Sequence, residues 1–166
     1  MQAATRMSYS SIPSTADEGG DSNLEYTPVK DIETICEEAR SFFWSHATLS
    51  QEFRMTQLEG ISRLVEENYD ALAESIRLDL GQSPMFAEVF ELSHIRPRVK
   101  HARQNLSDWM KTKRKPTNWP VNANVPVHSE LTPQPRGVCL IVTPFNLPVQ
   151  LSLNPMIDAI TAGNVV

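Results

Sequence analysis

The spacing of apolar residues between positions 31 and 110 predicts a series of amphipathic helices. Asp31 is a favourable N-cap for the first helix, which we expect to end near His46. Thr48 and Gln51 have the spacing of a capping box, so a second helix is predicted to begin there. The apolar faces recur every three or four residues: Ile32, Ile35, Cys36, Ala39, Phe42 and Phe43, then Leu58, Ile61, Leu64 and Val65.

Glycine and proline mark where these helices are interrupted. A third apolar set ends at Gly81, and the second and third sets form either one long helix or two helices joined at Asn68. Pro84 suits the first turn of the next helix. Pro97 predicts a kink or break near residues 94–96, because a proline inside a helix removes a hydrogen bond. The apolar positions are Tyr69, Leu72, Ala73, Ile76 and Leu80, then Phe86, Val89, Phe90 and Leu92, then Val99, Ala102, Leu106, Trp109 and Met110.

Beyond residue 116 the pattern changes to that of strands. Val125, Val127, Ser129 and Leu131 alternate with other residues as in an exposed strand. Residues 138–142 are an unbroken apolar run, typical of a strand covered on both faces. After the turn at residues 143–148, a helix from Pro148 carries Val149, Leu153, Met156, Ile157 and Ile160, and stops at Gly163 and Asn164. Val165 and Val166 begin what is predicted to be another strand.

These elements predict an α/β protein in four parts. Residues 1–30 hold too few large apolar side chains to offset the entropy of ordering, so we expect a disordered tail. Residues 31–115 form a helical segment, 116–135 a loop with the exposed strand, and 136–166 a strand–helix unit. A strand, a crossover helix and a second parallel strand require about thirty or more residues. The second strand has hardly begun at Val166, so we expect the sequence to be incomplete there.

Composition and charge narrow the class of protein. The net charge of −5 argues against a nucleic-acid-binding protein, because binding to phosphates requires a basic surface. The basic run from Lys111 to Lys115 is either a nuclear-import or nucleic-acid patch, or a solvated helix end, which we favour. No secretory signal is visible, and no apolar run approaches the ~20 residues that span a bilayer. We therefore expect a cytoplasmic protein without a membrane segment.

The cysteines and histidines do not form a metal-binding pattern. Cys36 and Cys139 lie far apart without a CxxC pair, and both are expected in the core, where burial suppresses thiol reactivity. His94 and His101 share a helix flank, but no third ligand accompanies them. We predict no metal site and a reducing compartment.

The segment SELTPQPRGVCLIVTPFNLPVQLSLNPMIDAITAGNVV resembles the aldehyde dehydrogenase superfamily. The family pattern is roughly P-x-G-V-hydrophobic-x-P-W-N-x-P, followed by a helix containing P-hydrophobic-x-x-A-hydrophobic-A-x-G-N. The positions that match it in register are Pro135, Gly137, Val138, Pro144, Asn146, Pro148, Pro155, Ala159, Ala162, Gly163 and Asn164. The upstream helices, especially QLEGISRLVEENYDALAESIRLDLG, are similar to the class 3 and fatty-aldehyde branch.

The resemblance implies an N-terminal helical part that leads into the start of a Rossmann-type NAD(P)-binding domain. It implies oxidation of a small-molecule aldehyde to a carboxylic acid through a cysteine thiohemiacetal, with NAD or NADP, in a homodimer when full-length. Asn146 matches the side-chain oxyanion donor of the family. Val142, Thr143, Pro144 and Phe145 would line the cofactor beside the nicotinamide ribose, and Phe145 replaces the tryptophan of most members.

Alternatives stand beside this interpretation. Asn146 could cap the helix that begins near Pro148 instead, and the two roles are compatible. The family nucleophile and general base lie beyond residue 166, so we expect this chain alone to be inactive. A second hypothesis is a naturally truncated, non-catalytic interaction or regulatory protein derived from the family, and a third is an unrelated acidic helical binding module.

Overall fold

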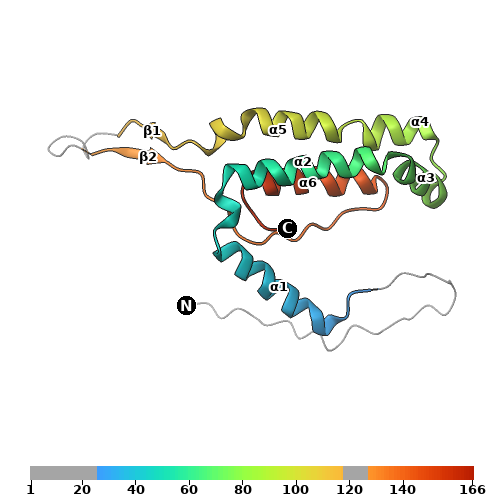
Figure 1. Ribbon diagram of the computed structural model, residues 1–166, viewed down its shortest axis with the longest axis horizontal. Helices are drawn as coiled ribbons and strands as arrows, with labels where there is room; N and C mark the ends of the chain where they lie inside the picture. The colour runs from blue at the N-terminus through green and yellow to red at the C-terminus, as the bar shows by residue number, and fades with distance from the viewer. Residues whose placement is uncertain (1–25, 118–126) are drawn as a thin grey trace.

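A three-helix core organises the computed structural model, which describes residues 26–117 and 127–166. Helices α2 (Gln51–Glu67), α5 (Ile95–Met110) and α6 (Pro148–Thr161) pack against one another (Figure 1). Their apolar faces meet in one cluster, in which Leu58, Ile95 and Ile157 are fully buried. The predicted periodicity therefore identified most of each buried face, although Leu64 on α2 and Trp109 on α5 are 48% and 43% exposed. The buried members are Leu58, Ile61, Val65, Leu92, Ile95, Val99, Ala102 and Ile157.

Helix α1 (Val29–Trp44) lies apart from this core, and none of its residues is buried (Figure 1). It begins two residues before the predicted cap Asp31, with Pro28 at the N-cap position. A short 3₁₀ helix, η1 (Ala47–Leu49), connects it to α2. The predicted capping box at Thr48 is wrong, because Ser50 caps α2 by accepting a hydrogen bond from the Phe53 amide at 3.3 Å. Serine accepts this bond as readily as threonine, so the two candidates differ only in register.

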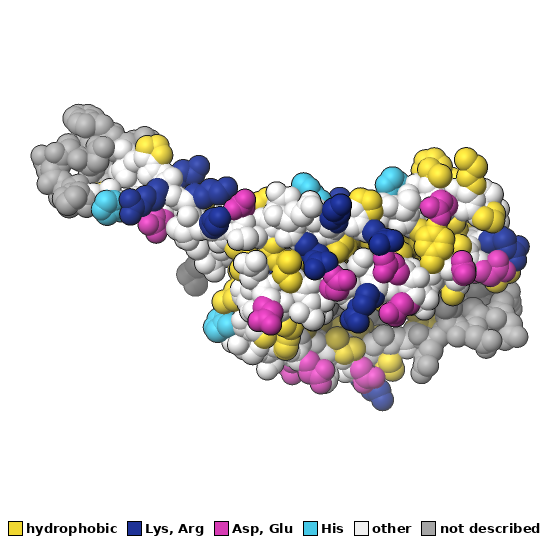
Figure 2. Space-filling model, turned by 45° about the horizontal axis from the view of Figure 1, so that its top comes forward, with side chains coloured by type: hydrophobic (Ala, Val, Ile, Leu, Met, Phe, Trp, Pro, Cys, Tyr) yellow, Lys and Arg dark blue, Asp and Glu magenta, His cyan; other side chains and the backbone are white. Residues whose placement is uncertain are grey.

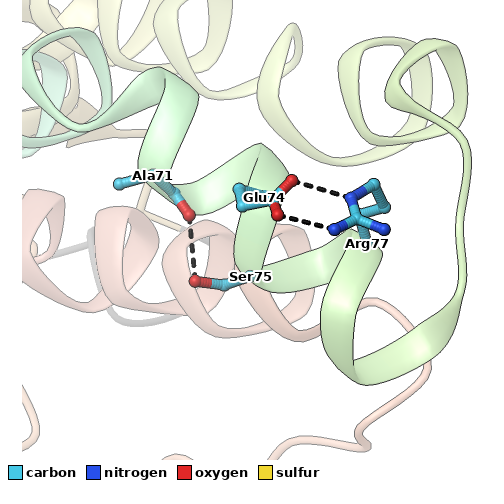
Figure 3. Close-up of polar contacts among 4 residues, drawn as sticks. All are labelled: Ala71, Glu74, Ser75 and Arg77. Carbon is cyan, nitrogen blue, oxygen red and sulfur yellow. Dashed lines mark hydrogen bonds and ion pairs between the residues drawn. The ribbon is translucent and has the colours of Figure 1, made fainter.

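Asn68 separates α2 from α3 (Tyr69–Leu80), so the second and third apolar sets form two helices. Gly81 ends α3 with φ of 65°, as expected for a glycine in the left-handed region. On the exposed side of α3, Arg77 binds both carboxylate oxygens of Glu74 at 2.7 Å, and Ser75 donates to the Ala71 carbonyl (Figure 3). The hydrogen bond from Arg77 lowers the pKa of Glu74.

The predicted interruption near residues 94–96 is confirmed, because a turn at Ser93 and His94 separates α5 from the π-helix that precedes it. Pro84 occupies the first turn of α4 (Pro84–Phe86), which continues into the π-helix η2 (Ala87–Leu92). The Ser93 amide donates to the Glu88 carbonyl at 3.0 Å, which is the five-residue step of a π-turn. Helix α5 then begins at Ile95, so Pro97 lies in its first turn. Its missing N–H costs little there, because the first amides of a helix have no partner within the helix.

The basic run does not end a helix, contrary to our prediction. Lys113–Lys115 form strand β1, which pairs antiparallel with β2 (Ser129–Leu131) and places Arg114 opposite Glu130. Pro116 disfavours a helical conformation at Lys115, and this explains the change to extended chain. The hairpin projects from the helices, and basic side chains gather along it (Figures 1 and 2). Val125, which was predicted to lie in the exposed strand, is outside the described residues.

The predicted buried strand at residues 138–142 is also wrong. Among the described residues, Val138 forms one isolated parallel bridge with Val165, and no regular strand follows. Leu140 is 89% exposed and Val142 is 84% exposed. An apolar run of this kind needs neighbouring strands and a covering layer on each face. Within the described chain, Val165 supplies the single pairing partner.

A buried arginine ties the C-terminal end of α6 to α2. Arg54 is only 6% exposed, and burial lowers the pKa of its guanidinium. Its Nε donates to the Thr48 carbonyl at 2.7 Å and its Nη1 to the Thr161 carbonyl at 3.1 Å. Gly163 follows with φ of 87°, and a Cβ there would lie 2.3 Å from Nη2 of Arg54. Only glycine fits this contact without displacing the arginine.

Substituting alanine at two glycines should therefore have opposite effects. We expect G163A to lower the free energy of unfolding by about 1–3 kcal/mol, through a strained φ and the clash with Arg54. The control G60A lies within α2 with no atom within 4 Å of the added Cβ, and should raise it by about 0.5–1 kcal/mol. Urea denaturation of both variants measures the difference, and equal shifts would contradict the arginine contact.

Candidate active site

The turn at residues 143–147 joins the extended segment to α6 and carries the predicted catalytic residue. Asn146 is exposed, and its side chain makes no hydrogen bond with any described residue. Its carboxamide is therefore accessible to a ligand. Leu147 is the N-cap residue of α6, and no cap bond comes from the side chain at that position. The alternative in which Asn146 caps the helix is not what the structure shows.

A different side chain binds the amides at the start of α6. Glu91 of η2 is 0% exposed, and its Oε2 accepts hydrogen bonds from the amides of Val149 at 2.8 Å and Gln150 at 3.2 Å. Pro148 occupies the first position of α6 and has no amide to satisfy. Sequence reasoning missed Glu91. Its signal was a glutamate four residues from both Ala87 and Ile95, on the stripe that becomes buried.

Backbone hydrogen bonds hold the segment before the turn against the end of α6. The Val165 amide donates to the Gly137 carbonyl at 3.0 Å, and the Cys139 amide donates to the Val165 carbonyl at 2.7 Å. This alternation between the two segments is the pattern of a parallel pair. It agrees with the prediction that Val165 begins a strand parallel to the first. The path from residue 138 through α6 and back thus forms the start of a strand–helix–strand unit.

Asn164 fastens the same junction through its side chain. It is 9% exposed, and its Oδ1 accepts from the amides of Arg136 at 2.6 Å and Gly137 at 3.0 Å. Its Nδ2 donates to the Ala159 carbonyl at 3.2 Å in the last turns of α6. The sequence indicated Asn164 only as a helix-stop residue. The bonds to residues 27 and 28 positions earlier could not be found from local spacing.

The predicted cofactor residues lie on the surface beside Asn146. Val142 and Phe145 are 84% and 83% exposed, Pro144 is exposed and Thr143 is half-buried. Three grooves in the described part of the chain lie elsewhere, and the one nearest in sequence, of about 650 Å³, runs between α1 and residues 134–140. Residues 142–145 thus present apolar side chains and backbone on an open surface. The four residues include no charged side chain.

The described residues contain neither a metal-binding cluster nor a membrane-spanning helix. No group of three or more His, Cys, Asp or Glu side chains there could hold a metal ion. No described helix is both long enough and apolar enough to cross a bilayer. Both cysteines are free and half-buried, Cys36 on α1 and Cys139 in the extended segment.

Comparison with known proteins identifies the class to which this turn and helix belong. Residues 11–166 match the model of the aldehyde dehydrogenase family. Aldehyde dehydrogenase family 3 member B1 of Bos taurus is 37% identical over 127 residues, which are 76% of this chain and 26% of that protein. The 4,4'-diaponeurosporen-aldehyde dehydrogenase of Staphylococcus aureus is 34% identical over 133 residues, which are 80% of this chain and 28% of that protein.

A solved structure gives the same result for the fold. The structure described as the substrate-bound state of Staphylococcus aureus AldH superposes with a TM-score of 0.75 at 33% identity, over 80% of this chain and 28% of that one. The chain belongs to the aldehyde dehydrogenase family and has the start of its fold. It spans about a quarter of the length of the relatives it matches. The predicted family, its class 3 branch and the fold class are thereby confirmed.

The role of Asn164 can be tested by separating its acceptor from its donor. We expect N164A to lower the free energy of unfolding by about 2–4 kcal/mol, because two amides lose their acceptor in a nearly buried place. N164D keeps an acceptor oxygen for the two amides but turns a negatively charged oxygen toward the Ala159 carbonyl in place of the donor, so it should also lower the free energy of unfolding. Urea denaturation curves measure the free energy of unfolding of both variants. An N164A protein as stable as the parent would show that the Asn164 side chain does not stabilise this junction.

Proposed function

We propose that this chain is the N-terminal part of an NAD(P)-dependent aldehyde dehydrogenase that oxidises an aldehyde to a carboxylic acid. Family membership supports the reaction class. The main observation in support of this site is that the Asn146 carboxamide, in the turn before α6, is exposed and has no hydrogen bond with the described residues. We place the complete enzyme in the cytoplasm as a homodimer without a nucleic-acid partner.

Asn146 is proposed to stabilise the oxyanion that forms when a nucleophile adds to the aldehyde carbonyl. A neutral amide N–H suits this task, because it donates a hydrogen bond without needing to titrate. Its value depends on being aimed beforehand at the position where negative charge develops. A side chain already bound within the protein would have to break a bond first, whereas Asn146 has none with the described residues.

The adjacent residues are proposed to bind the cofactor. When bound, NAD or NADP would accept the hydride that leaves the substrate carbon. Val142 and Phe145 would contact its nicotinamide half through their exposed side chains, and Thr143 and Pro144 would contribute backbone surface. Phe145 keeps an aromatic wall but has no N–H to donate, unlike a tryptophan. Phosphate binding would then depend on other segments of the complete protein.

One observation favours the second hypothesis, a non-catalytic interaction protein. Val138, Leu140 and Val142 expose apolar surface along a segment paired only at Val165 among the described residues. Such a segment favours association with another chain. In the enzyme hypothesis, the same surface is covered by further parts of the same protein.

The two hypotheses predict different native species. For the enzyme, we expect a protein several-fold larger than 18.7 kDa in the natural source, with aldehyde-dependent NAD(P) reduction. The 166-residue chain, purified alone, should reduce neither cofactor. Intact-mass measurement of the natural protein and an absorbance assay on both forms provide the test. A stable native 18.7 kDa species without cofactor reduction would instead favour the interaction protein.

The role of Asn146 gives a second test on the natural enzyme. We expect N146A to lower kcat by about 10²- to 10³-fold, with a smaller change in cofactor affinity, because the lost donor acts mainly in the transition state. N105A is a suitable control, since among the described residues the Asn105 side chain bonds only to His101 on α5. Steady-state kinetics of both variants are compared, and an unchanged kcat in N146A would refute the oxyanion role.

A further inference from the structure

The buried carboxylate of Glu91 is the most unusual polar group in the core. It comes from η2, which packs against α3 and α6, and it has no exposure to solvent. Burying a carboxylate without hydrogen-bonding partners is strongly unfavourable. Here Oε2 accepts two backbone amides at the positive end of a helix, and Oε1 has no partner. The hydrogen bonds to the α6 amides thus offset the unfavourable free energy of burying the Glu91 carboxylate.

The amides that Glu91 binds are the ones that an asparagine cap would use. If Asn146 capped α6, its side chain would accept from the second or third residue after it, which are Pro148 and Val149. Pro148 has no N–H, and the Val149 amide donates to Glu91 instead. Occupation of this amide by Glu91 leaves no helix amide within reach of the Asn146 side chain. The carboxamide therefore stays available.

The anchor lies close enough along the chain to control the direction of Asn146. Only Leu147 and Pro148 separate Asn146 from the first anchored amide. The proline ring holds φ of Pro148 near −65°, so few backbone torsions are free between the two points. Leu147 has φ of −140° and ψ of 68°, and the Leu151 amide donates to its carbonyl at 3.0 Å. The turn is thus fixed from the helix side.

We propose that Glu91 is a positioning residue for the active site. By binding the amides of Val149 and Gln150, it holds the first turn of α6 and directs the Asn146 carboxamide toward the ligand. This inference rests on the proposed function of Asn146. The π-helix contributes to this positioning, because its wider turn changes the direction in which Glu91 projects relative to a regular helix.

The first experiment measures the anchor in the 166-residue chain and needs no activity. Amide hydrogen exchange at Val149 and Gln150, and the NMR signals of the Asn146 side-chain amide, are compared in four proteins: wild type, E91Q, E91L and E88L. E91L removes the acceptor, so exchange at both amides should accelerate by about tenfold or more, and the Asn146 signals should shift. The control E88L changes an exposed glutamate of the same π-helix and should alter neither signal.

E91Q separates the hydrogen bonds from the charge. Both bonds end on Oε2, so the single carbonyl oxygen of glutamine can accept both. We therefore expect E91Q to exchange within about threefold of wild type. If E91L fails to fold, E91D replaces it, because its shorter side chain withdraws the acceptor from α6. Wild-type exchange at both amides in E91L or E91D, or unshifted Asn146 signals, would overturn the proposal.

The second experiment uses the natural full-length protein in which cofactor reduction is assayed. E91L should lower kcat by about tenfold or more with KM for aldehyde and cofactor within about twofold, and E91Q should restore most of kcat. An E91L enzyme with wild-type kcat, or one whose loss is shared equally by E88L, would overturn positioning. If the wild-type protein reduces no cofactor, the proposed function fails, and the exchange measurement still decides whether Glu91 orients Asn146.

Discussion

The arrangement of this chain depends on how α6 is held at its two ends. Glu91 accepts the amides at its start, and Arg54 donates to the Thr161 carbonyl at its end. A helix leaves amides without partners at its N-terminus and carbonyls at its C-terminus, and its dipole favours an anion at the first and a cation at the second. Both charged groups come from other elements, η2 and α2, and both are buried. They therefore fix the position of α6 along its own axis, which apolar packing alone leaves free to slide.

The fixed helix in turn determines where the segments on either side of it lie. At its start, the turn with Asn146 leaves the core and reaches the surface. At its end, Gly163 passes Arg54 closely, and Asn164 binds the backbone of Arg136 and Gly137. The entry and exit of the strand–helix–strand unit are thus joined by one side chain. Apolar burial supplies most of the stability of such a unit, while these few polar contacts determine its geometry.

Local patterns predicted the helices well and the tertiary contacts poorly. The faces of α2, α5 and α6 followed from spacing alone, because a period of 3.6 residues places them on one side whatever they pack against. The errors at Thr48 and at Lys113–Lys115 concern neighbours one or two residues away, where several cap or turn residues compete. The prediction of a buried strand at residues 138–142 was wrong for another reason. Their apolar composition is typical of a strand that is covered on both faces, but the described residues supply only one pairing partner, Val165.

In the candidate site, too, residues within a local sequence pattern could be predicted and residues that act through distant contacts could not. Asn146 and residues 142–145 were identified from a matched pattern, which depends on sequence order and not on the fold. Glu91 was missed because its partners, Val149 and Gln150, lie 58 and 59 residues away, and no local rule connects a glutamate to a helix that far along the chain. The one signal in the sequence was that Glu91 places a carboxylate on the apolar face of its helix, where charged residues are rare. Such a residue costs stability unless a distant partner satisfies it, so its presence in a sequence predicts a tertiary hydrogen bond even before the partner is known. In this chain that bond lies directly beside the residue proposed to do the chemistry.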